Sequence, residues 1–81
     1  MNKRMKLLDS VKHNPRDWRM DDLLVLARQV GIECRNHGGS HHVFSYPGVE
    51  GLVTVPAHRP IKPVYIRQFL LLVADVQELQ R

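Results

Sequence analysis

Residues 31–56 read GIECRNHGGSHHVFSYPGVEGLVTVP, and this stretch decides the fold. Three short segments rich in β-branched and aromatic residues, GIEC, HHVFSY and GLVTVP, are separated by Gly-Gly and Pro-Gly turn signals. Strands joined by connections this short pair as an antiparallel meander. Pro56 marks the end of the third strand, because proline has no N–H to donate to a ladder. The stretch therefore predicts a three-stranded antiparallel sheet.

Apolar residues repeat at helical spacing on the N-terminal side of this stretch. Residues 20–30 place Leu23, Leu26, Ala27 and Val30 on one face of a helix, and Gly31 stands where a left-handed residue closes it. A shorter amphipathic helix is expected over residues 3–12, and Pro15 stops it.

A final helix follows the sheet. Pro63, after the stiff loop HRPIKP, suits the first helical position. The expected buried stripe of this helix is Ile66, Phe69, Leu70, Val73 and Val76. The element order is therefore α-α-β-β-β-α, an α+β fold with the helices packed on one face of the sheet and the other face left to solvent.

The 81 residues are enough for one domain, residues 1–81, with a small core. No apolar run approaches the ~18–20 residues that cross a bilayer, and the N-terminus lacks the apolar region of a signal peptide. The single cysteine, Cys34, excludes an internal disulfide and fits a reducing cytoplasm.

Positive charge gathers in the middle of the chain. Lysine and arginine outnumber acidic residues by twelve to eight, giving a net charge of +4. Between residues 35 and 67 the formal charges are Arg35, Arg59, Lys62 and Arg67 against Glu50 alone, and four of the five histidines lie there too: His37, His41, His42 and His58. This excess suggests a polyanion such as nucleic acid as partner, although a solvated basic surface explains it equally well.

The stretch GGSHHVF places adjacent histidines, His41 and His42, at the start of the second strand. Neighbouring strand residues point to opposite faces, so one ring should face the helices and the other solvent; alternation alone does not say which. Histidine can both accept and donate a proton at neutral pH. RNA carries its own nucleophile, the 2′-OH. Cleaving RNA without a metal therefore needs a base, cations for the phosphate and an acid for the leaving oxygen.

Other kinds of site fit less well. Cys34-x-x-His37, with His41 or His58, has a ligand-like spacing, but structural zinc wants four ligands and usually more thiolates. We therefore expect no metal and no cofactor. No phosphate-cradling loop with Lys-Ser/Thr occurs, and no pair of carboxylates lies in the strand-rich region.

From about Met20 to the C-terminus, the combination of GGSHHVFSYPG, VTVPAHRPIKP and the helix beginning VYIRQFL resembles the HicA-type toxins of bacterial toxin–antitoxin systems. Two features depart from the family pattern. Residues 1–19 form an extra N-terminal helix and turn before the family core, residues 20–81. The final helix opens Val64-Tyr65-Ile66-Arg67 where many members have Gly-Thr-Leu-Arg, so only the arginine is kept.

The resemblance implies a fold like the double-stranded-RNA-binding domain and a metal-independent ribonuclease that cleaves mRNA. It implies a HicB-type antitoxin that masks the active site. The family's catalytic histidine follows Gly-Ser, which makes His41 the general acid/base here. His58 is a candidate second proton-transfer or phosphate-binding group. The residues expected to hold the RNA backbone are Arg35, His58, Arg59, Lys62 and Arg67, with Arg67 acting beside a helix N-terminus. A non-catalytic RNA-binding module and a protein that docks an acidic partner stay open as alternatives.

Overall fold

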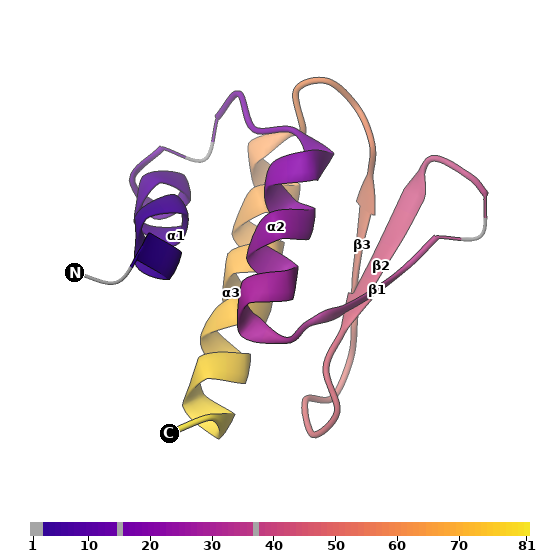
Figure 1. Ribbon diagram of the computed structural model, residues 1–81. Helices are drawn as coiled ribbons and strands as arrows, with labels where there is room; N and C mark the ends of the chain where they lie inside the picture. Colours follow the sequence, from indigo (N-terminus) through magenta and orange to yellow (C-terminus); the bar gives the residue numbers. More distant parts are fainter. Residues whose placement is uncertain (1–2, 15, 37) are drawn as a thin grey trace.

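The computed structural model describes residues 3–14, 16–36 and 38–81. Its elements are α1 (Lys3–His13), α2 (Met20–Val30), β1 (Glu33–Arg35), β2 (His41–Ser45), β3 (Val53–Pro56) and α3 (Pro63–Leu79) (Figure 1). This order confirms the predicted α+β fold with a three-stranded antiparallel sheet. The elements also begin and end close to where the sequence placed them, and α1 runs one residue further than expected.

The sheet has the strand order β1-β2-β3, and both pairs are antiparallel. The helices α2 and α3 lie side by side over one face of the sheet, while α1 lies on the far side of this helix pair (Figure 1). The opposite face of the sheet carries no helix in Figure 1. The molecule is therefore layered, with one sheet face available to a partner.

The core joins the sheet to α3 through two phenylalanines. Phe44 from β2 and Phe69 from α3 are both fully buried, and their rings meet edge to face with centroids 4.9 Å apart. Burying each such side chain stabilises the fold by ~1.5–3 kcal/mol. Because a strand alternates, burial of Phe44 fixes which face of β2 points toward the helices.

The predicted stripe of α3 is correct at Ile66, Phe69, Val73 and Val76, which are all buried. It is wrong at Leu70, which is only partly buried, and it omits Leu72, which is 4% exposed. The buried arc of α3 is displaced from the expected stripe toward Leu72, which lines a cleft together with Val49 from the β2–β3 connection and Val53 of β3.

The ends of α2 follow from its sequence. At the start, the Asp22 carboxylate accepts a hydrogen bond from the backbone N–H of Arg19 at 2.9 Å. At the end, Gly31 has the left-handed φ of 83°, and the N–H of Ile32 donates to the carbonyl of Ala27 at 2.8 Å. Ile32 is 6% exposed, so it packs back on the helix as expected and turns the chain directly into β1.

The N-terminal segment contacts the rest of the molecule through buried side chains and hydrogen bonds. Leu8 and Val11 of α1 are buried in the same core as the sheet residues. Trp18, in the connection between α1 and α2, donates its indole N–H to the carbonyl of Asn14 and accepts the backbone N–H of Ile61 at 3.0 Å. These contacts hold the connection against the loop that precedes α3. None of the described helices is both long and apolar enough to cross a membrane.

Candidate active site

His41 is the exposed histidine of the adjacent pair. It is the first residue of β2, and it lies on the face of the strand opposite to buried Phe44. His42 shares a face with Phe44, pairs with buried Val55 on β3 and is partly buried. The structure thus answers the question that alternation left open, because it leaves the His41 ring on the face without helices.

The side chain of Asn36 stabilises the loop that leads into His41 through hydrogen bonds. Its side-chain oxygen accepts the backbone N–H of Gly38 at 2.7 Å, and its amide nitrogen donates to the carbonyl of Gly39 at 3.0 Å. The same amide nitrogen lies 3.0 Å from Nε2 of His42. His42 therefore helps to hold this loop, whereas His41 is left available. Asn36 was not identified from the sequence, although an asparagine two residues before a glycine is typical of a turn that the side chain caps.

Gly38 has a structural reason to be glycine. Its φ is +86°, in the left-handed region that residues with a Cβ rarely adopt. A Cβ built on Gly38 or on Gly39 meets no described atom within 4 Å, so the requirement comes from the backbone and not from crowding. The Gly-Gly pair thus gives the chain a sharp turn just before the exposed histidine.

The loop after β3 lies beside the start of β2. The N–H of Ala57 donates to the carbonyl of Ser40 at 2.6 Å, which continues the ladder beyond the last paired strand residues, His41 and Pro56. His58 and Arg59 follow directly and are exposed. Although His41 and His58 are 17 positions apart in the sequence, the ladder brings their backbones to the same end of the sheet.

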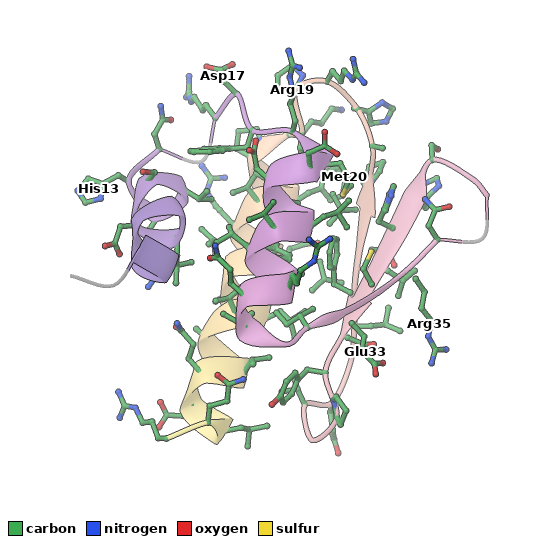
Figure 2. All side chains as sticks on the ribbon, viewed as in Figure 1. His13, Asp17, Arg19, Met20, Glu33 and Arg35 are labelled. Carbon is green, nitrogen blue, oxygen red and sulfur yellow. The ribbon has the colours of Figure 1, made fainter. Side chains whose placement is uncertain are left out.

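Arg35 lies on the same sheet face as His41. The register pairs Arg35 with Val43, and His41 is two residues from Val43 on the same side of β2. Arg35 is exposed and points away from α2 (Figure 2). The two side chains are therefore diagonal neighbours on the open face.

Lys62 and Arg67 lie at the beginning of α3, on the helical layer. The carbonyl of Lys62 accepts the N–H groups of Tyr65 and Ile66, and Pro63 has no N–H. Few backbone donors of this helix end therefore face outward, so its attraction for an anion comes mainly from the two exposed side chains. The structure does not bring Lys62 or Arg67 onto the sheet face that carries His41 and Arg35.

The residues whose spacing resembles a metal site do not converge within the described chain. His37 lies outside the described residues, and His41 and His42 point to opposite faces. The described residues contain no group of three His, Cys, Asp or Glu side chains placed to hold an ion. Burial raises the pKa of the Cys34 thiol, which favours the neutral form over the thiolate that binds metals.

Comparison with known proteins gives one match. Residues 20–73 match the family model described as the HicA toxin of bacterial toxin-antitoxin systems. The matched range runs from the first residue of α2 into α3 and contains every site residue expected from the sequence. No curated protein and no solved structure matches the chain.

Proposed function

Because this chain belongs to the HicA family of toxins from bacterial toxin–antitoxin systems, we propose that it is an mRNA-cleaving ribonuclease with His41 as general acid/base. The observation that supports this proposal best is the position of His41. It is exposed on the sheet face without helices, at the end where the loop carrying His58 and Arg59 meets β2. His42 lies on the helix side of β2, which supports His41 as the ring of the pair that contacts RNA.

The reaction uses the substrate's own hydroxyl. His41 takes the proton of a ribose 2′-OH, and the 2′-oxygen attacks the adjacent phosphorus. The bond from phosphorus to the 5′-oxygen breaks, and that oxygen receives a proton from an acid, for which His58 is the candidate. The products are a 2′,3′-cyclic phosphate and a 5′-hydroxyl. The chain's own groups do all of this proton transfer, and no step needs a metal or a cofactor.

The cations hold the substrate. Arg35 lies on the open face beside His41, and Arg59 lies in the loop after β3 that meets the start of β2. The two cations would stabilise the extra negative charge that develops on the phosphate. Lys62 and Arg67, at the start of α3, would contact more distant phosphates of the same RNA. These contacts read the shape and backbone of RNA and not its base sequence.

A toxin of this kind requires an antitoxin in the same cell. We place the protein in the cytoplasm, where mRNA is translated, and propose a HicB-type antitoxin as its protein partner. An antitoxin that covers the open face of the sheet would block His41 and Arg35 together. This partner is proposed from family membership, and the exposed His41 side of the sheet is the surface it would have to mask.

Growth and transcript integrity test the proposal directly. Wild type, His41→Ala and His13→Ala are each expressed in bacteria without a partner. His13 is also exposed, but it lies on α1 on the far side of the molecule (Figure 2), so its loss removes an imidazole without touching the site. We expect wild type and His13→Ala to stop growth and fragment mRNA, and His41→Ala to do neither.

The same experiment separates the alternatives when RNA binding is measured alongside. A non-catalytic RNA-binding module would bind RNA but leave transcripts intact in all three strains. A protein that only docks an acidic partner would lack the salt-sensitive affinity for RNA that phosphate contacts produce. Phosphate contacts release counterions, so their affinity falls steeply as the salt concentration rises. Either result would overturn the ribonuclease proposal.

A further inference from the structure

Cations from two separate segments gather at one end of the molecule. Arg16 and Arg19 belong to the connection between α1 and α2, Arg59 follows β3, and Lys62 precedes α3. Figure 1 shows that α2 and α3 both begin at this end, where the loop after β3 also passes. Arg19 extends from it into solvent, with Asp17 nearby (Figure 2).

Two clefts join the N-terminal cations to the cations of the family core. One cleft of about 120 Å³ is lined by both Arg19 and Arg59. A second cleft, of about 480 Å³, is lined by both Arg16 and Lys62. Each N-terminal arginine is thus next to a basic residue already expected to bind RNA.

The relative placement of these segments is fixed by the fold. The N–H of Ile61 donates to the carbonyl of Trp18 at 3.0 Å, so the chain between Arg16 and Arg19 is bonded to the chain between Arg59 and Lys62. Ile61 is 1% exposed and therefore anchors the loop in the core. The arginines of the N-terminal connection are consequently held beside the core cations and do not merely pass near them.

The balance of charge at this end is positive. Asp17 lines the larger cleft and Asp21 the smaller one, and the Asp22 carboxylate accepts the backbone N–H of Arg19, so four cations lie near three carboxylates. All four cations are exposed: Arg16, Arg19, Arg59 and Lys62. Within the described part of the chain, none of them forms an ion pair, since the only pair there joins Arg81 to Glu78. Their charges are therefore available to an external anion.

We propose that Arg16 and Arg19 bind the phosphate backbone of the RNA and extend the binding surface beyond the family core. This inference rests on the proposed ribonuclease function. Both residues precede Met20, where the family match begins, so they are contacts that the N-terminal segment adds. An RNA strand whose scissile phosphate lies at His41 would continue past Arg59 and Lys62 onto Arg19 and Arg16.

The salt dependence of RNA binding tests the inference. A full-length His41→Ala parent binds a fluorescent RNA oligonucleotide without cutting it, and its affinity is measured over a range of NaCl concentrations. Each phosphate contact contributes ~0.7 to the slope of log affinity against log salt for single strands. Adding Arg16→Gln and Arg19→Gln should therefore make the slope shallower by about 1.4.

A matched control removes the same charge elsewhere. Arg28 is exposed in the last turn of α2, about 13 Å along the helix from Arg19, and Arg81 is exposed after the C-terminal end of α3. Charges separated by more than the Debye length of ~10 Å at 0.1 M salt are largely screened. The pair Arg28→Gln and Arg81→Gln should therefore leave the slope unchanged.

The outcomes distinguish the inference from the function on which it rests. If the parent binds RNA in a salt-dependent way and the Arg16→Gln, Arg19→Gln variant has the same slope, the inference is wrong. The ribonuclease proposal is unaffected by that result. A parent that binds no RNA overturns both. An equal loss of slope in the control pair also overturns the inference, because it shows only the effect of net charge.

Discussion

The two adjacent glycines before His41 should respond in opposite ways to alanine. Gly38 has a φ of +86°, and Gly39 lies outside the left-handed region. A Cβ at either position meets no described atom within 4 Å, so the backbone alone decides the effect. Holding a residue with a Cβ in the left-handed region costs ~1–2 kcal/mol. At a position without that strain, replacing glycine by alanine gains ~0.4–1 kcal/mol, because the unfolded chain loses freedom.

Both substitutions restrict the unfolded chain in the same way, so the free energies of unfolding of Gly38→Ala and Gly39→Ala should differ by the strain alone, about 1–2 kcal/mol. For a domain of this size, 1 kcal/mol shifts Tm by ~4–8 °C, so the two melting temperatures should lie about 4 °C or more apart. Thermal and urea unfolding followed by circular dichroism measure this difference. Two variants that melt together would show that the loop does not have the geometry described, and the account of how His41 is presented would lose its basis.

Three further results follow from the same structure. Asn36→Ala removes the hydrogen bonds to Gly38 and Gly39, each worth ~0.5–1.5 kcal/mol, and so loosens the loop before His41. Single-turnover RNA cleavage should slow while the affinity for RNA is unchanged, and unchanged cleavage would contradict the role of Asn36 in holding this loop. Phe44→Ala should cost ~3–5 kcal/mol by urea unfolding, since Phe44 is fully buried; a loss below 1 kcal/mol would contradict the core assignment. Burial raises the pKa of the Cys34 thiol, so the contribution of Cys34 to stability is fully present below the pKa of the unfolded thiol and is lost as the pH rises through the pKa of the folded thiol. Near pH 8, alkylation of Cys34 should therefore be slower in the native protein than in urea, and equal rates would contradict this prediction.

The local signals of the sequence predicted most of the fold. Gly31 and Pro63 mark a helix end and a helix start by their own backbone chemistry, and both positions are confirmed. Periodicity also identified the buried face of α2, where Leu23, Leu26 and Ala27 are buried. It failed between Leu70 and Leu72, because both are leucines at one edge of the stripe and the sequence of α3 does not show where the hairpin residues beside Leu72 lie.

The site was harder to predict than the fold because it depends on contacts between distant segments. His41 and His42 are chemically identical, and only the packing of Phe44 against Phe69 decides which ring is exposed. Arg16 and Arg19 carry no motif of their own. Their place beside Arg59 and Lys62 comes from the hydrogen bond between the backbones of Trp18 and Ile61, which local patterns do not reveal.

The central claim is that the exposed imidazole of His41 transfers a proton during RNA cleavage. Its most direct test is the single-turnover rate at which purified protein cuts RNA in the presence of EDTA, comparing wild type with His41→Ala. General acid–base catalysis contributes ~10²–10⁴-fold, so the variant should cut at least about a hundred times more slowly while it binds the RNA equally well. A variant that cuts within a factor of two of wild type would contradict the account.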